Sequence, residues 1–345
     1  MSIYNLTNGS DDFSSATVTP RFAGDSSVFG NNGNDSITIA GSESWHSILV
    51  DGGKGSDKIL FPDYAPFEST IRGGDGDDTI YAGHSAFTRG EKDVLDGGNG
   101  SDTITFWGTD STVSGGNGND SIFAGIGPNT VSGGDGDDSI VDYGASSVSG
   151  GNGNDTITLI SDHADVWGSN VDGGSGDDVL TSRSFHGGLS QPSYAVDRGN
   201  VLTGGQGKDS FTVTDSSDLA VTNDPAGSNP GVVGAGDQIV GIIDEITDYS
   251  AGELLAIPGT HPVETVALGG PASPYGPPPD PDHQHLVLGD GDYALIRGTL
   301  TAPGSFTVDP AAGHDLLVVY DAPSGSLQGA VALLGVTDAS SVLIG

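Results

Sequence analysis

Residues 115–123 read GGNGNDSIF, residues 133–141 read GGDGDDSIV, and residues 150–158 read GGNGNDTIT. Each segment places glycine at its first, second and fourth positions, aspartate at its sixth and isoleucine at its eighth. Glycine readily adopts positive φ, whereas a β-branched residue favours a strand. The pattern therefore predicts a tight turn that leads into a short strand, and it predicts that this unit recurs along the chain.

Nine blocks of the chain fit this nine-residue pattern. Only the first block lacks the paired glycines, because Asn31 stands at its second position, and asparagine tolerates positive φ better than most residues. An aliphatic residue two positions before each block, such as Val113 or Val131, predicts a second short strand in every unit. The blocks begin at Gly30, Gly52, Gly73, Gly97, Gly115, Gly133, Gly150, Gly173 and Gly204.

These units predict an all-β fold, a flattened parallel coil in which successive turns stack. One unit has too few aliphatic side chains for a core, whereas stacked units would bury them in a continuous column. Near the middle of the chain the spacing between blocks equals one further nonapeptide, as in AGIGPNTVS at residues 124–132. We therefore expect about two nonapeptides per coil, with the full motifs on one edge and degenerate segments on a return edge.

Composition limits the partners of the chain. Its 345 residues include 10 Lys and Arg against 47 Asp and Glu, a formal net charge of −37. Nucleic acids and anionic membrane surfaces require basic patches, so we expect neither as a partner. The chain has no cysteine, which excludes disulfides and thiolate metal sites. It also has neither an apolar run of membrane-spanning length nor an ordinary N-terminal signal peptide, so we expect a soluble protein with another export signal.

The turn composition itself points to a hard cation. Glycines let backbone carbonyl oxygens converge without Cβ clashes, and the aspartate at position six adds a carboxylate at every level. A stacked row of such carboxylates would repel itself unless cations lay between the levels. Calcium accepts six to eight oxygen ligands, including backbone carbonyls, in flexible geometry, and suits such a row better than magnesium does. We expect about eight calcium ions between the nine turns, which would offset about sixteen negative charges.

The nine registered motifs, from Val28 to Thr212, resemble the RTX (repeats-in-toxin) calcium-binding nonapeptide repeats of type I secreted proteins from Gram-negative bacteria. The resemblance implies a right-handed parallel β-roll with calcium between stacked turns, in which aspartate carboxylates and turn carbonyls of successive motifs hold each ion. The side-chain ligands that it implies are Asp35, Asp57, Asp78, Asp102, Asp120, Asp138, Asp155, Asp178 and Asp209. The implied carbonyl ligands are Asn31, Gly33, Gly53, Gly55, Gly74, Gly76, Gly98, Gly100, Gly116, Gly118, Gly134, Gly136, Gly151, Gly153, Gly174, Gly176, Gly205 and Gly207. The return segments have Asn129 or other residues in place of aspartate, so we expect that edge to be largely free of calcium.

We expect three parts in the chain: an N-terminal cap at 1–27, the roll at 28–212, and a β-rich capping and secretion region at 213–345. Residues 237–257 resemble the segment that follows RTX repeats, and residues 315–344 are similar to C-terminal regions of type I secreted proteins. A solenoid end exposes unpaired strand edges, so a cap is required there. Two features of the last part stay open: His283 and His285 in a proline-rich loop could bind a transition metal or be solvated, and Asp290 and Asp292 could bind calcium or form a turn.

The sequence contains no His-Glu-x-x-His, Gly-x-Ser-x-Gly or P-loop motif, so we expect no enzymatic activity. The favoured function is a secreted, calcium-binding structural protein, a subunit of a surface layer or extracellular assembly that folds when calcium binds. Its partners would be further copies, a surface polysaccharide or another surface protein, and the type I exporter. An adhesin or carbohydrate-binding module that uses the inserts of the return edge is the alternative, and an accessory module of a polysaccharide-modifying enzyme is a third possibility.

Overall fold

The computed structural model describes 15 segments of the chain. They divide into two compact units, the first comprising residues 1–158 and 172–176 and the second residues 159–171 and 177–345. The described segments are residues 2–15, 25–40, 46–63, 66–83, 90–161, 168–184, 199–214, 219–222, 233, 235–241, 243–258, 261–264, 266–272, 280–321 and 328–345.

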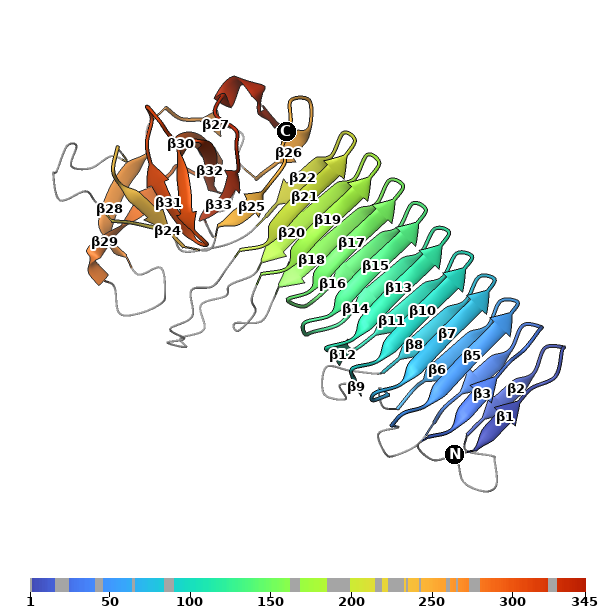
Figure 1. The fold of residues 1–345 in the computed structure, drawn as a ribbon. Coiled ribbons are helices and arrows are strands. Elements are labelled where there is room, and N and C mark those ends of the chain that lie inside the picture. Colours follow the sequence, from blue (N-terminus) through green and yellow to red (C-terminus); the bar gives the residue numbers. More distant parts are fainter. Residues whose placement is uncertain are drawn as a thin grey trace. The chain divides into compact units, whose positions relative to one another are not determined.

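The first unit consists of stacked rungs, and each rung contributes one strand to each of two parallel sheets (Figure 1). Within each sheet, every strand pairs in parallel with the next along the chain. One sheet is formed by β1 (Ile3–Asn5), β3 (Ser27–Phe29), β5 (Leu49–Lys54), β7 (Thr70–Asp75), β10 (Val94–Asn99), β13 (Thr112–Asn117), β15 (Thr130–Asp135) and β17 (Ser147–Asn152). The other is formed by β2 (Asp12–Ser14), β4 (Ser36–Thr38), β6 (Lys58–Phe61), β8 (Thr79–Ala82), β11 (Thr103–Phe106), β14 (Ser121–Ala124) and β16 (Ser139–Asp142).

Three further elements complete the first unit. The short strands β9 (Gly90–Glu91) and β12 (Gly108–Thr109) pair in parallel with each other in the return segments. The strands β18 (Thr156–Ser161) and β19 (Asn170–Ser175) have residues in both units.

The core of the first unit is the predicted column of aliphatic side chains. Residues two positions before a motif and at its eighth position are at most 2% exposed, and burial of each such side chain contributes about 1.5–3 kcal/mol. No α-helix occurs among the described residues, and the stacked strands of both sheets pair in parallel. The prediction of an all-β, parallel β-roll is therefore confirmed. The column contains Val28, Ile37, Val50, Ile59, Ile71, Ile80, Leu95, Ile104, Val113, Ile122, Val131, Ile140, Val148 and Ile157.

The second unit combines parallel rungs with an antiparallel β-structure. One set of parallel strands is β20 (Val179–Ser184), β22 (Ser210–Val213), β26 (Leu254–Ala256) and β34 (Leu343–Ile344), and another is β21 (Val201–Gln206), β25 (Asp244–Ile246) and β33 (Gln328–Leu333). The antiparallel part contains β23 (Ala220–Thr222), β24 (Gln238–Val240), β28 (Ala267–Ala272), β29 (Asp280–Val287), β30 (Asp292–Ala302), β31 (Ser305–Val308) and β32 (Asp315–Asp321). The strand β27 (His261–Pro262) pairs in parallel with β30, and η1 (Ala339–Ser341) is a single 3₁₀ turn.

Two parts of the fold extend the rung pattern beyond the recognised motifs. At the N-terminus, β1 and β2 form a rung that stacks on β3 and β4. In the second unit, the last strand of the chain, β34, pairs with β26. The boundaries at residues 27 and 212 remain a prediction. Among the described residues, no helix is long and apolar enough to cross a membrane.

Candidate metal sites

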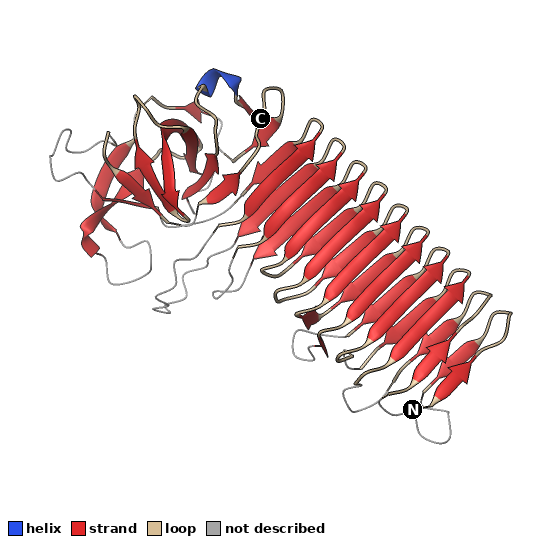
Figure 2. Ribbon diagram, in the orientation of Figure 1, coloured by secondary structure: helices blue, strands red, loops and turns tan. Residues whose placement is uncertain are grey.

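Each motif forms a turn that connects a strand of one sheet to a strand of the other. The turn Gly115–Asp120, for example, connects β13 to β14, with φ of +120° at Gly116 and +117° at Gly118. Such values are the left-handed region that only glycine adopts readily, which explains the glycines at positions two and four. Figure 2 shows these turns as a row of loops along one side of the first unit. The turn geometry thus follows from the local sequence.

The aspartates at position six are buried in a regular arrangement. In the first unit, Oδ1 of each aspartate accepts a hydrogen bond from the backbone N–H of the preceding aspartate in the row, as in Asp102 N–H to Asp120 Oδ1 and Asp120 N–H to Asp138 Oδ1, both 2.7 Å. The same bond links Asp178 to Asp209 in the second unit, at 2.9 Å. All nine predicted aspartates are only 1–3% exposed: Asp35, Asp57, Asp78, Asp102, Asp120, Asp138, Asp155, Asp178 and Asp209.

The second carboxylate oxygen, Oδ2, has no comparable hydrogen-bond partner among the described residues in seven of these nine aspartates. A buried carboxylate oxygen without a hydrogen bond is costly, and in native proteins it usually indicates a proton or a bound ion. Asp155 and Asp178 are as deeply buried as the other aspartates. Oδ2 accepts no hydrogen bond from any described residue in Asp35, Asp57, Asp78, Asp102, Asp120, Asp138 and Asp209.

Burial also shifts the protonation equilibria of the row. Loss of hydration is the main cause, and it raises the pKa of Asp120 and Asp138 to about 6 and the pKa of Asp78 to about 7. The bond from the backbone N–H opposes this shift, while the carboxylates of adjacent turns add to it. At the strand spacing of about 4.8 Å, neighbouring charges repel by about 3–4 kcal/mol at an effective dielectric of about 20. A divalent cation between the turns would remove both penalties.

The first glycine of each motif also takes part, although the prediction did not include it as a ligand. A Cβ on Gly115 would overlap both Asp120 Oδ2 and the carbonyl oxygen of Gly133 in the next turn. These two oxygens therefore border the same small space, which is open only because position one has no side chain. The same pairing recurs at Gly30, Gly52, Gly73, Gly97, Gly133 and Gly150. The presence of glycine at position one in all nine motifs was the sequence signal for this role.

The predicted carbonyl ligands belong to the second and fourth residues of each motif. A Cβ on Gly116 would overlap the Gly98 carbonyl oxygen, and a Cβ on Gly118 would overlap the Gly100 carbonyl oxygen. The second and fourth positions of adjacent motifs thus stack directly on one another throughout the first unit. Asn31 fits this stack with φ of +73°, and its carbonyl accepts the N–H of Lys54 at 2.8 Å. Which of these carbonyls would contact an ion remains a prediction.

The donor set suits calcium better than other metals. The two polar atoms nearest to a Cβ on Gly115 are both oxygens, Asp120 Oδ2 and the Gly133 carbonyl oxygen, and the chain has no cysteine. Among the described residues, no three Asp, Glu or His side chains converge as a metal cluster. An ion between the turns would therefore depend on carbonyl oxygens, and Ca²⁺ accepts such oxygens in large coordination shells.

The return edge has a different set of ladder residues. Ser69 N–H donates to Asp93 Oδ1 at 2.8 Å, and Ser111 N–H donates to Asn129 Oδ1 at 3.1 Å. Asn129 Nδ2 donates to the Gly108 carbonyl at 3.1 Å, so an amide satisfies the atom that corresponds to Oδ2 in the motifs. Asp93 is the acidic exception; burial raises its pKa to about 7. Ser69, Ser111 and Asn129 are neutral, whereas in the second unit the same kind of bond runs from Ser169 to Asn200 and from Asn200 to the acidic Asp244. That this edge is largely free of calcium stays a prediction.

In the second unit, the segment after the repeats contacts the last motif. Asp248 Oδ1 and Oδ2 accept the N–H groups of Gly204 and Gly205 at 2.9 and 2.8 Å. The Tyr249 hydroxyl donates to the Glu253 carbonyl at 2.8 Å and accepts the N–H of Leu343 at 3.0 Å. This segment thus covers turn donors and holds the final strand in place, as expected of a cap.

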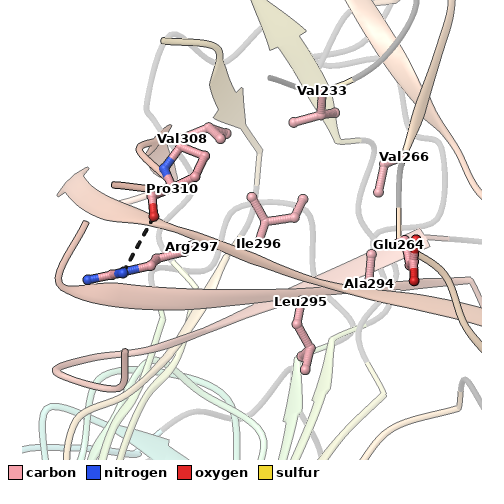
Figure 3. A pocket seen from close by; sticks show the side chains of 9 residues that line it. All are labelled: Val233, Glu264, Val266, Ala294, Leu295, Ile296, Arg297, Val308 and Pro310. Atoms are coloured by element: carbon pink, nitrogen blue, oxygen red, sulfur yellow. Dashed lines mark hydrogen bonds between the residues drawn. The ribbon is translucent and has the colours of Figure 1, made fainter. Parts of the chain in front are cut away.

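A separate pocket of about 270 Å³ lies in the second unit (Figure 3). Its surface is mainly aliphatic, with Glu264 and Arg297 as its charged residues, and Arg297 donates to the carbonyls of Gly313 and Pro310 at 2.9 and 3.4 Å. None of the lining residues is a histidine, serine or cysteine. The pocket is lined by Val233, Glu264, Val266, Ala294, Leu295, Ile296, Arg297, Val308 and Pro310.

Some residues singled out in the sequence remain without a structural assignment. The backbones of His283 and His285 belong to β29, and Asp290 and Asp292 lie at the turn that precedes and begins β30. Burial, and to a smaller extent the charges of Asp290 and Asp292, raise the pKa of Asp321. Whether any metal binds to these histidines or aspartates stays a prediction.

Comparison with protein-family models identifies the repeats. Five segments of the chain match the model of the RTX calcium-binding nonapeptide repeat: residues 23–38, 69–86, 89–113, 114–141 and 142–159. The motifs that begin at Gly52, Gly173 and Gly204 lie outside these matches, although their aspartates are buried in the same way. The comparison with curated proteins returned no match.

Proposed function

We propose that this protein, of which five segments between residues 23 and 159 match the RTX calcium-binding nonapeptide repeat, is a secreted structural protein that folds on binding calcium. The observation that carries the proposal is the series of buried aspartates whose Oδ2 atoms accept no hydrogen bond from the described residues. A fold that buries such a series is stable only when protons or cations neutralise it, and at neutral pH calcium is the suitable cation.

About eight ions would bind between the nine turns. Each ion would contact Oδ2 of one aspartate and turn carbonyls from its own motif and the next, with the first glycine of the next motif as an additional ligand. The carboxylate and carbonyl oxygens that lie beside the first glycine of successive motifs support this set of ligands, and the number follows from one ion between each pair of adjacent turns. The return edge would contribute few or no ions, since Ser111 and Asn129 use hydrogen bonds at the corresponding positions.

Calcium dependence suits export in an unfolded form. In a cytoplasm with little free calcium, the ion could not stabilise the native state, and the chain with its net charge of −37 would remain extended. Outside the cell of a Gram-negative bacterium, millimolar calcium would bind only the folded state and shift the equilibrium toward it. Passage through a type I exporter would therefore precede folding.

The proposed role outside the cell is a non-catalytic subunit of a surface layer or another extracellular assembly. The described residues form a roll and a β-rich unit, an architecture that suits a building block. Electron microscopy of the purified protein at high concentration, with and without millimolar calcium, tests this role. Ordered polymers that appear only with calcium are expected, whereas a strictly monomeric calcium-loaded protein would contradict the assembly role.

One observation favours the alternative of an adhesin or carbohydrate-binding module. Trp107, Phe123 and Tyr143 are each half-buried and form an aromatic stack, with ring centroids 4.9 and 5.2 Å apart. Aromatic side chains that are partly exposed on a sheet can support a sugar ring or another partner. Trp45 and Trp167 lie outside the described residues. A glycan array on which the wild type binds and Trp107→Ala does not would favour this function, and an array without signal would count against it.

A further inference from the structure

Residues 6–11 form a tenth turn of the same series, ahead of the nine recognised motifs. Asp11 N–H donates to Asp35 Oδ1 at 2.7 Å, the bond that links every later pair of aspartates in the first unit. Asn34 N–H donates to Ser10 Oγ at 3.1 Å. Gly9, Asp11 and Phe13 occupy the fourth, sixth and eighth positions of the motif. The turn therefore has the register of a calcium-type turn, although Leu6 and Thr7 stand where the motif has its paired glycines.

The carboxylate of this turn is satisfied by the protein itself. Asp11 Oδ2 accepts hydrogen bonds from both the N–H and the hydroxyl of Thr7, each at 2.7 Å. In Asp35, the next residue of the series, the corresponding Oδ2 accepts no hydrogen bond from any described residue. Two donors satisfy Oδ2 of the partly exposed Asp11, whereas the buried Oδ2 of Asp35 would need a proton or a cation. Thr7 thus takes the place that we assign to calcium in the later turns.

The first two positions of the turn also differ in a way that closes the space for an ion. Leu6 stands where the motifs have glycine, and in the next turn a Cβ on Gly30 would overlap Asp35 Oδ2 and the Gly52 carbonyl oxygen. Thr7 stands at position two, where φ ranges from +73° at Asn31 to +121° at Gly151, and it is not among the described residues with positive φ. A side chain at each position therefore favours a turn without the cation space.

Asn31, the one departure from the paired glycines in the nine motifs, contacts this terminal turn. Its Nδ2 donates to the Leu6 carbonyl at 2.7 Å. Glycine at position 31 could not make this bond. The side chains of Leu6, Thr7 and Asn31 thus act together at the first turn, and each deviates from the motif at the place where a cation or its ligands would otherwise lie.

We propose that Leu6–Asp11 is an ion-free turn, in which Thr7 replaces the cation and Leu6 fills its space. The series of calcium-binding turns would then begin with the motif at Gly30, and this ion-free turn would cover it. This inference rests on the proposed calcium binding by the later turns. It predicts that glycine at positions 6 and 7 together creates one additional calcium site beside Asp11, with the Gly30 carbonyl as its partner in the next turn.

The test counts calcium ions per chain by equilibrium dialysis followed by elemental analysis, with the wild type measured in parallel. The double variant Leu6→Gly/Thr7→Gly is expected to bind one ion more than the wild type. Thr7→Ser, which keeps the hydroxyl and the side chain, is expected to bind the same number as the wild type. An unchanged count in a folded double variant would overturn the inference.

A second pair of variants covers the case in which the double variant loses its first rung. Asp11→Asn is expected to leave the ion count unchanged, whereas Asp35→Asn is expected to lower it by one, because only the second carboxylate lies beside an ion. Loss of an ion in Asp11→Asn would contradict the ion-free turn. A wild type that binds no calcium at all would instead overturn the proposed function, so the two failures are distinguishable.

Discussion

The two carboxylate oxygens of Asp120 have different surroundings, and this difference separates the two roles of the residue. Oδ1 accepts the N–H of Asp102 at 2.7 Å, which fixes the carboxylate between successive turns. Oδ2 is buried without a hydrogen bond from the described residues and borders the carbonyl oxygen of Gly133. One oxygen thus stabilises the stack regardless of ions, while the other is available to a cation.

Asp120→Asn separates these two contributions. The amide oxygen can still accept the bond from Asp102, but the charge that attracts calcium is lost. We expect the variant to bind about one ion fewer and to lose about 3 kcal/mol of stability in calcium, the contribution of an ion present at about 100 times its Kd. Equilibrium dialysis and urea unfolding in millimolar calcium measure the two effects.

Asp93→Asn is the matched control on the return edge. Asn129 occupies the corresponding position in the next-but-one rung and satisfies its Nδ2 through the Gly108 carbonyl. We therefore expect Asp93→Asn to keep the full ion count and to be as stable as the wild type or more so, because a buried unpaired charge is removed. A loss of calcium in this variant equal to that in Asp120→Asn would show that the return edge also binds ions.

At the level of elements, the motif turns could be predicted well from sequence, because each turn depends on local rules. Glycine at positions two and four meets a need for positive φ, and the aliphatic residue at position eight enters the column. The return ladder could not be predicted, since Ser69, Ser111 and Asn129 have ordinary polar side chains whose bonds form only between rungs. The first turn was missed because Leu6 and Thr7 replace both paired glycines, and only the spacing of Gly9, Asp11 and Phe13 remained as a signal.

The requirement for glycine differs between turns in a testable way. Gly118 has φ of +117° and a Cβ there would overlap the Gly100 carbonyl, whereas a Cβ on Gly9 would meet no atom closer than 3.9 Å. We expect Gly118→Ala to destabilise the calcium-loaded protein by about 1–3 kcal/mol and Gly9→Ala by less than about 0.5 kcal/mol. Urea unfolding in calcium measures both; equal losses would contradict the structural difference between the two turns.

The aspartate row predicts an unusual dependence of stability on pH when calcium is absent. Its folded-state pKa values of about 6 to 7 exceed the unfolded value of about 3.9, because burial disfavours the charged form. Protonation therefore stabilises the fold: the contribution is complete below pH 4 and is lost as the pH rises through 6 to 7.

In chelator, we accordingly expect β structure to increase as the pH falls from 8 to 5, measured by circular dichroism. In calcium, the same acidification should weaken ion binding, because protons compete for Oδ2. A chelated protein that loses β structure steadily from pH 8 to 5 would show that the row does not control this equilibrium.

At the scale of the whole molecule, the large negative charge of the chain disfavours the compact parallel β-roll. The net charge of −37 favours an extended chain, while the column from Val28 to Ile157 favours the stacked fold. Calcium would resolve this conflict by binding only the folded state. The fold would then respond to the calcium concentration of its surroundings, as a protein exported before folding requires.

Far-ultraviolet circular dichroism of the full chain at pH 7.5, in millimolar calcium and after complete calcium removal, tests this account most directly. We expect a β spectrum in calcium, a coil spectrum without it, and full recovery when calcium is restored. A β spectrum that persists unchanged after elemental analysis shows no remaining calcium would contradict the account.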